Sequence, residues 1–147
     1  MYARILVPTD GTELSIKAVV EAARLASRLG SKLLLLHVRS PIDARHHPEG
    51  GALTHLPPEV IQAEIEDDER HVLDAAVRTA AESGVAAEVA FTAAYKPAEA
   101  INRVCREQGC DLIVMASHGR GRLAELVVGG TTHKVLTNAP VPVLVVH

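Results

Sequence analysis

Residues 111–119 read Asp-Leu-Ile-Val-Met-Ala-Ser-His-Gly, an apolar run that ends in small and polar residues. A run of this length bounded by turn residues is typical of a buried strand. Similar runs occupy residues 4–7, 32–38, 86–92 and 141–146. The run at 32–38 is almost continuously apolar, as expected of a strand that helices cover on both faces.

Helical patterns separate these runs, at residues 13–29, 58–82, 97–108 and 132–136. Thr12 is a candidate N-cap for the first helix, and Gly30 is a C-cap signal at its end. Residues 39–57 hold several prolines and glycines with little periodicity. We therefore predict a long excursion between the second strand and the second helix.

Strands that alternate with helices predict a single α/β domain over residues 1–147. Right-handed crossovers favour one open parallel sheet of five strands in the order 3-2-1-4-5, with helices on both faces. In that order the carboxyl ends of strands 1 and 4 flank the point where the winding reverses. Ligands bind at this point in open α/β sheets.

Composition narrows the classes of partner. The formal net charge is −3 and aromatic residues make up only 2% of the chain, which argues against nucleic-acid or anionic membrane surfaces as partners. No apolar run has the length of a membrane span. We expect a cytoplasmic protein whose Cys105 and Cys110 are reduced and partly buried.

Two segments that carry polar residues and glycines are predicted to converge at the switch point. Pro8-Thr9-Asp10 follows strand 1, and Ala116-Ser117-His118-Gly119 follows strand 4. Gly119 and Gly129-Gly130 permit close backbone approach and positive φ, and a helix beginning near Gly130 points N–H groups at a phosphate. Hydroxyl groups and positive charge come from Thr131, Thr132, Arg120, Arg122 and Lys134. The residues alone fit either an anion cradle or a loop whose glycines serve turns and caps.

The chain resembles the universal stress protein family over nearly its whole length. The resemblance rests on residues 5–12 (Ile-Leu-Val-Pro-Thr-Asp-Gly-Thr), 35–38 (Leu-Leu-His-Val), 112–119 and 140–146. The family's ATP-binding branch carries glycine, two residues, glycine, nine residues, glycine, then Ser or Thr. Here Gly119 and Gly129 keep the nine-residue gap, whereas Ala116 stands at the first glycine and Gly130 at the Ser or Thr.

The resemblance implies an adenine nucleotide alpha hydrolase-like fold that binds ATP, alone or with Mg²⁺. Asp10 and the backbone near Thr9 and Val38 would hold the adenine and ribose, and residues 116–119 and 129–132 would hold the phosphates. The residues assigned to nucleotide binding are Pro8, Thr9, Asp10, Val38, Met115, Ala116, His118, Gly119, Gly129, Gly130, Thr131 and Thr132. The family resemblance also implies a homodimer through the C-terminal strand, which is apolar and lies at a sheet edge.

Three functional hypotheses follow. The first is an ATP-binding stress-response or signalling module. The second is a nucleotide-free interaction module of the same fold, in which Gly130 marks the loss of binding and the long helix, with the 39–57 excursion, meets an unknown protein partner. The third is a slow ATPase. We identify no catalytic residues and no metal site, and the residues themselves also allow Asp10 to be only a turn residue and His118 only a loop histidine.

Two further groups of residues have simple interpretations. His46, His47, His55 and His71 lack the spacing of a zinc site and are interpreted as parts of a solvated loop and its surroundings. The acidic run at residues 64–69 is interpreted as the solvent face of the long helix.

Overall fold

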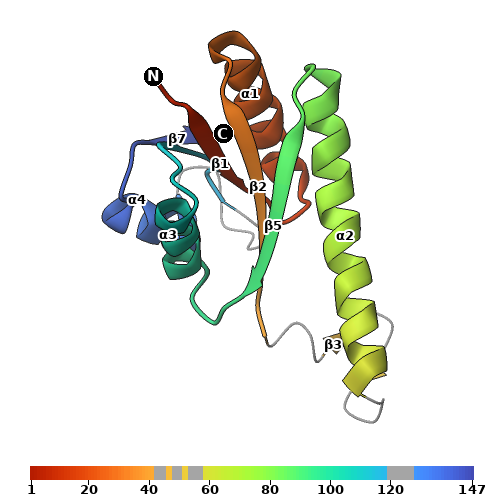
Figure 1. Ribbon diagram of the computed structural model, residues 1–147. Helices are drawn as coiled ribbons and strands as arrows, with labels where there is room; N and C mark the ends of the chain where they lie inside the picture. The colour runs from red at the N-terminus through yellow and green to blue at the C-terminus, as the bar shows by residue number, and fades with distance from the viewer. Residues whose placement is uncertain (42–45, 48–50, 53–57, 119–127) are drawn as a thin grey trace.

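The computed structural model describes residues 1–41, 46–47, 51–52, 58–118 and 128–147. In chain order its elements are β1 (Arg4–Pro8), α1 (Glu13–Leu29), β2 (Lys32–Arg39), β3 (His46–His47), β4 (Gly51–Ala52), α2 (Pro58–Glu82), β5 (Ala87–Ala93), α3 (Pro97–Glu107), β6 (Leu112–Ala116), α4 (Gly130–Asn138) and β7 (Val143–Val146). Figure 1 shows the chain running from β1 near the N-terminus to β7 near the C-terminus.

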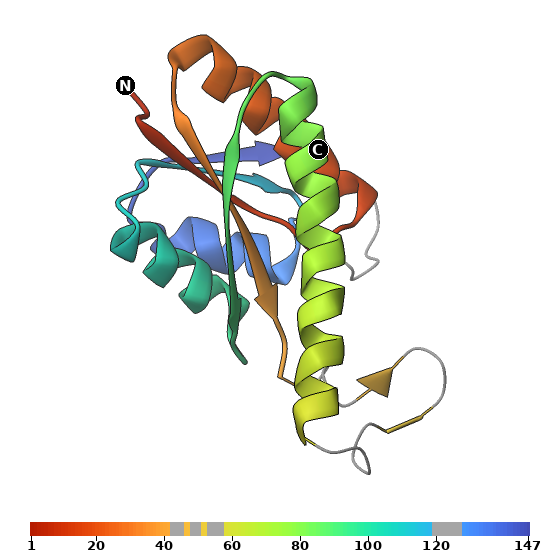
Figure 2. The ribbon, with the colours of Figure 1, turned by 45° about the vertical axis from the view of Figure 1, so that its right-hand side comes forward.

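The main sheet is parallel and has the strand order β5-β2-β1-β6-β7, which confirms the predicted order 3-2-1-4-5. Helices α1 and α2 cover one face of the sheet, and α3 and α4 cover the other (Figure 2). The short strands β3 and β4 form a separate antiparallel pair within the predicted 39–57 excursion. In the described part of the chain, no helix combines the length and apolarity needed to cross a membrane.

The apolar strands alternate between the two layers of the core. In β2, Leu33 and Leu35 pack with α1 and α2, whereas Leu34 and Leu36 pack with the α3 and α4 layer. All four side chains are buried, which explains why the run is continuously apolar rather than alternating.

Helix α1 begins and ends as the capping residues predict. The Thr12 hydroxyl oxygen accepts from the Ser15 N–H at 3.3 Å, and Gly30 adopts the left-handed conformation with φ of 69°. Both caps satisfy backbone groups that the helix itself leaves unpaired.

The end of the chain differs in detail from the prediction. Helix α4 extends beyond the predicted range of residues 132–136 in both directions. Strand β7 begins at Val143 rather than at residue 141, because Pro142 has no N–H to donate to a ladder. The Pro142 carbonyl still accepts from the Ile113 N–H at 3.0 Å.

One member of the acidic run on α2 does not face solvent as predicted. Asp67 and Asp68 are exposed, but Glu69 is only 4% exposed. Its carboxylate accepts from the Arg39 Nε at 2.9 Å, so an ion pair joins α2 to the end of β2. A helical repeat places Glu69 toward the sheet, and the arginine makes that position possible for a carboxylate.

The two cysteines are free and buried at the junction of α3 and β6. Burial is the main cause that raises the pKa of Cys105 to about 11 and raises the pKa of Cys110. The N–H of Cys110 donates to the carbonyl of Cys105 at 3.0 Å, and the N–H of Gly109 donates to that of Arg106. These two bonds close the C-terminus of α3 in a Schellman motif.

At the amino end of the sheet, Asp111 ties β1 to β6. Its carboxylate oxygens accept from the N–H of Arg4 at 2.9 Å and from the N–H of Ala3 at 2.7 Å. These two donors, the Arg4 N–H first, hold the pKa of Asp111 below its ordinary value. The ionised carboxylate therefore stabilises the folded chain.

We expect Asp111→Asn to destabilise the protein in a pH-dependent way. Because the folded-state pKa is lowered, the contribution of Asp111 is fully present above the unfolded value of about 4 and is lost as the pH falls through the folded value. Urea unfolding of both proteins at pH 7 and at successively lower pH measures the difference. A constant difference in unfolding free energy down to the lowest pH at which both proteins fold would contradict this role.

Candidate functional site

The loop that follows β1 is tightly fixed at Thr9. This residue is 4% exposed, its N–H donates to the Leu36 carbonyl at 2.8 Å, and its hydroxyl lies 3.0 Å from that of Ser15. Its carbonyl is bonded to Nδ1 of His37 at 2.9 Å. The backbone and hydroxyl groups of Thr9 are thus used to hold the loop, whereas Pro8 is the last residue of β1.

Asp10 has a structural role in the same loop. Its Oδ1 accepts from the Thr12 N–H at 3.0 Å and from the Thr12 hydroxyl at 2.6 Å. The arrangement is an Asx turn, and it orients the hydroxyl that caps α1. Asp10 is therefore a turn residue, as the residues themselves allow, and its half-buried carboxylate lies at the carboxyl edge of the sheet.

Helix α2 packs directly over this loop. Gly11 has φ of 78°, and a Cβ added there would lie 3.4 Å from the Val72 side chain. Glycine is required at this position by the positive φ, and its small size lets α2 approach the loop.

The peptide groups of Val38 face the space beyond the end of β1. Backbone bonds of β2 alternate in direction: the Leu36 carbonyl binds Thr9 on the β1 side, and the Arg39 carbonyl binds Ala94 on the β5 side. Val38 shares the direction of Leu36, but β1 ends at Pro8, opposite Leu36. Among the described residues, no backbone hydrogen bond joins Val38 to the β1 side.

The end of β6 is held against the start of α4 by two bonds. The Thr132 hydroxyl donates to the Ala116 carbonyl at 2.9 Å, and the Gly129 N–H donates to the Ser117 carbonyl at 2.7 Å. Ser117 is buried, and its hydroxyl lies 3.1 Å from Nδ1 of the half-buried His118. The Met115 side chain is buried in the core between the sheet and α3, and its backbone pairs with Val145 of β7.

The two adjacent glycines have different environments, and neither has the positive φ that we expected to be available to them. A Cβ added to Gly129 would lie 3.0 Å from both Cα and Cβ of His118. Close backbone approach therefore requires glycine at 129. A Cβ added to Gly130 would meet no atom of the described residues within 4 Å.

The start of α4 has the features of an anion site. Gly129 is its N-cap and has no side chain, so the N-cap residue leaves the first N–H groups of the helix uncapped. Thr131 and Lys134 are exposed. Thr132 is only 2% exposed, and its hydroxyl donates to the Ala116 carbonyl. Of the two threonines, Thr131 is therefore the one whose hydroxyl can face a ligand.

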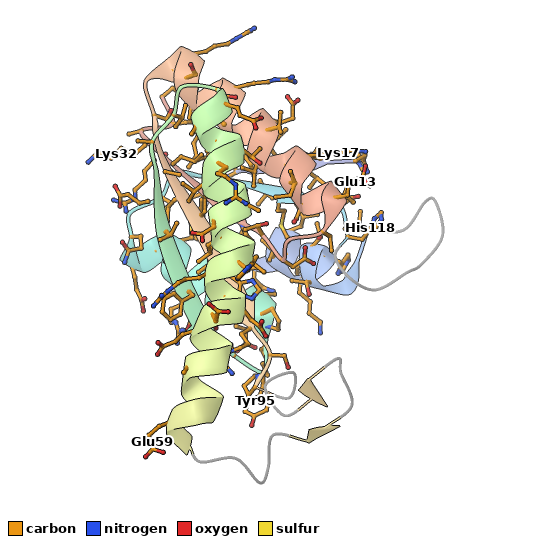
Figure 3. All side chains as sticks on the ribbon, turned by 90° about the vertical axis from the view of Figure 1, so that its right-hand side faces the viewer. Glu13, Lys17, Lys32, Glu59, Tyr95 and His118 are labelled. Carbon is orange, nitrogen blue, oxygen red and sulfur yellow. The ribbon has the colours of Figure 1, made fainter. Side chains whose placement is uncertain are left out.

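The described residues of the predicted site lie at one edge of the sheet, because β1, β2 and β6 are parallel neighbours. In Figure 3, His118 lies on the same side of the molecule as Glu13 and Lys17 from the start of α1. Gly119, Arg120 and Arg122 lie outside the described residues.

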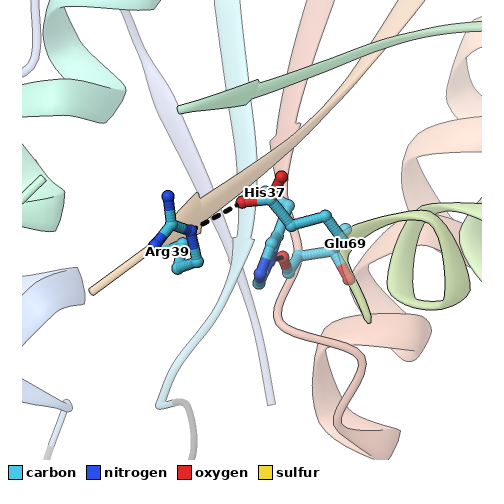
Figure 4. A network of polar contacts seen from close by, with 4 residues as sticks. His37, Arg39 and Glu69 are labelled. Carbon is cyan, nitrogen blue, oxygen red and sulfur yellow. Dashed lines mark hydrogen bonds and ion pairs between the residues drawn. The ribbon is translucent and has the colours of Figure 1, made fainter. Parts of the chain in front are cut away.

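Two contacts at the end of β2 escaped the sequence analysis. His37 binds the Thr9 carbonyl, and Arg39 pairs with Glu69 of α2, so the end of β2 is joined both to the β1 loop and to α2 (Figure 4). A histidine within an otherwise apolar strand is the sequence signal that could have identified the first contact. The second contact joins positions far apart in the chain and has no local signal.

Comparison with known proteins places the fold and site in context. The model of the Universal stress protein family matches residues 1–147. Universal stress protein YxiE of Bacillus subtilis is 33% identical over 151 aligned positions that cover all of both chains. The structure of universal stress protein UspA from Lactobacillus plantarum superimposes with a TM-score of 0.78 at 26% identity, covering 99% of this chain and 98% of that one.

Two more distant structures share the fold and contain nucleotides. One is a universal stress protein in complex with cAMP, with a TM-score of 0.72 at 22% identity over 99% of this chain and 97% of that one. The other is the universal stress protein from Archaeoglobus fulgidus in complex with dAMP, with a TM-score of 0.69 at 20% identity over 99% of this chain and 98% of that one.

We expect Gly129→Ala and Gly130→Ala to differ sharply. The new methyl group at 129 presses on the His118 backbone, so unfolding by urea is expected to show a loss of about 1–3 kcal/mol. The methyl group at 130 enters open space at the start of a helix, where alanine is at least as favourable as glycine. Equal stability of the two variants would contradict the close approach of Gly129 to His118.

Proposed function

This chain belongs to the universal stress protein family, and we propose that it binds an adenine nucleotide, ATP alone or with Mg²⁺, at the carboxyl edge of its sheet. The observation that carries the proposal is the start of α4, where the N-cap residue Gly129 provides no side-chain cap and the helix begins beside the end of β6. The signalling role we propose is cytoplasmic, with nucleotide occupancy altering a surface that protein partners recognise.

The phosphate groups would lie at α4. Helix N-termini favour anions because their free N–H groups and the helix dipole both point at the ligand. Gly130 leaves room for a phosphate to approach the backbone, and Thr131 and Lys134 can add a hydroxyl donor and a positive charge. Ala116 stands where the family motif has glycine, but the contact between β6 and α4 is kept, because the Thr132 hydroxyl still donates to the Ala116 carbonyl.

The base and ribose would lie at the ends of β1 and β2. The N–H and C=O of Val38 offer one donor and one acceptor toward the space that β1 vacates. The Asp10 carboxylate would accept from a ribose hydroxyl while it keeps its turn around Thr12. The cAMP and dAMP complexes of two proteins with this fold support the choice of an adenine nucleotide.

Calorimetric titration with ATP and with AMP, each with and without Mg²⁺, tests the proposal. Gly130→Ser restores the residue type of the family motif, and its hydroxyl is expected to gain about 1 kcal/mol, or roughly fivefold, in ATP affinity. Gly130→Ala is the matched control, because it adds the same Cβ without the hydroxyl.

Heat of binding for ATP, and tighter binding by Gly130→Ser than by Gly130→Ala, would support a phosphate site at α4. No heat for the unmodified protein at high micromolar ATP would overturn nucleotide binding and favour the interaction module instead. Equal affinities of the two variants would leave binding intact but move the phosphates away from residue 130.

We also propose a homodimer through β7. This strand is an edge of the main sheet, and its Leu144 side chain is 44% exposed. An apolar edge strand presents unpaired peptide groups to another chain, and a two-fold contact between identical strands closes without further growth.

Leu144→Lys is expected to shift the protein from dimer to monomer in sedimentation velocity at micromolar concentration, because it places a charge within the interface. Leu136→Lys on α4 is a matched control, since Leu136 is 42% exposed but belongs to α4 rather than to the edge strand. A monomeric unmodified protein, or dissociation by both substitutions alike, would contradict dimerisation through β7.

A further inference from the structure

We infer that His37 is a positioning residue that keeps the peptide groups of Val38 open for the base of a nucleotide. Its imidazole withdraws the Thr9 carbonyl from the place where it would otherwise pair with the Val38 N–H. The inference rests on the proposed nucleotide site for its function, whereas its structural part stands on the geometry of β1 and β2.

The register of the two strands defines the competing bond. Pro8 lies opposite Leu36, and the Thr9 N–H continues the ladder by donating to the Leu36 carbonyl. In a parallel ladder the next bond would run from the Val38 N–H to the Thr9 carbonyl. That carbonyl instead lies 2.9 Å from Nδ1 of His37, and the ladder stops.

The chemistry of this contact fixes the histidine tautomer. A carbonyl oxygen can only accept, so Nδ1 of His37 carries the proton. The ring is 9% exposed and belongs to the face of β2 that points toward α1 and α2, as do Leu33 and Leu35. The buried imidazole of His37 thus makes the hydrogen bond to the Thr9 carbonyl that the Val38 N–H would otherwise make.

The result is a short stretch of β2 that extends beyond its partner. The N–H and C=O of Val38 point in the same direction, toward the space past Pro8. A donor next to an acceptor matches the adenine edge that presents N1 and the N6 amino group, whereas guanine held in the same orientation presents the opposite pattern at N1 and O6. His37 would therefore act on base selectivity without touching the base.

A neighbouring contact on β2 provides a control for purely structural effects. Arg39 and Glu69 form an ion pair between β2 and α2, one residue beyond Val38 (Figure 4). Among the described residues, neither side chain forms a hydrogen bond with Thr9. Loss of this pair is expected to lower stability while leaving the Thr9 carbonyl on His37.

The test compares His37→Leu, His37→Asn and Glu69→Gln in the full chain. Leucine removes the donor and keeps the apolar volume, whereas the side-chain amide of asparagine places an N–H close to the position of Nδ1. The first measurement is hydrogen exchange at the Val38 amide without nucleotide. We expect fast exchange in the unmodified protein, in His37→Asn and in Glu69→Gln, and slow exchange in His37→Leu, where Val38 closes onto Thr9.

The second measurement is the ratio of ATP to GTP affinity by calorimetry. His37→Leu is expected to lower ATP affinity about tenfold and to bring the ratio close to one, because one base contact is lost. His37→Asn should restore both, and Glu69→Gln should lower the unfolding midpoint without changing the ratio.

The outcomes separate this inference from the nucleotide site itself. If no protein binds nucleotide but the exchange pattern holds, the structural role of His37 stands and the proposed function fails. If ATP binds and His37→Leu folds with unchanged selectivity, the positioning role is wrong. Slow exchange at Val38 in the unmodified protein would also overturn it.

Discussion

The pairing of β1 with β2 on one side and β6 on the other is the constraint on which the rest of the structure depends. Ile5, Leu6 and Val7 are fully buried, so β1 can lie only at the centre of the sheet, with helices over both faces. Because all three strands are parallel, their carboxyl ends meet at one edge. The loop after β1 and the start of α4 meet there for the same reason.

At that edge, backbone N–H and C=O groups beyond the last hydrogen bonds of the sheet need other hydrogen-bond partners. The Thr9 carbonyl binds His37, the Ala116 carbonyl binds the hydroxyl of Thr132, and the Ser117 carbonyl binds the N–H of Gly129. Each partner comes from a different element than the group it satisfies. Among the described residues, the peptide groups of Val38 and the first N–H groups of α4 have no such partner, and the proposed nucleotide would bind these groups.

The sequence predicted the fold well because its signals are local. Runs of apolar residues defined the strands, Thr12 and Gly30 marked the ends of α1, and crossover handedness then fixed the strand order. The same local patterns failed at Glu69, which a charge run placed in solvent and an arginine distant in sequence brought into the interior. They also indicated a close backbone approach at Gly129, which its contact with His118 confirms, whereas the positive φ that they allowed at this position does not occur.

The two departures from the family motif differ in their physical consequences. Ala116 occupies the last position of β6, in an extended conformation that any residue adopts, and its carbonyl bond to Thr132 is independent of its own side chain. Gly130 keeps the N–H that a phosphate would contact and lacks only a hydroxyl, and its surroundings would accept a larger residue. At Gly129 a Cβ would press on His118, and here the chain has the glycine of the motif. The chain thus keeps the glycine that shapes the backbone at the start of α4, and it lacks a hydroxyl that would add one hydrogen bond to the proposed phosphate site.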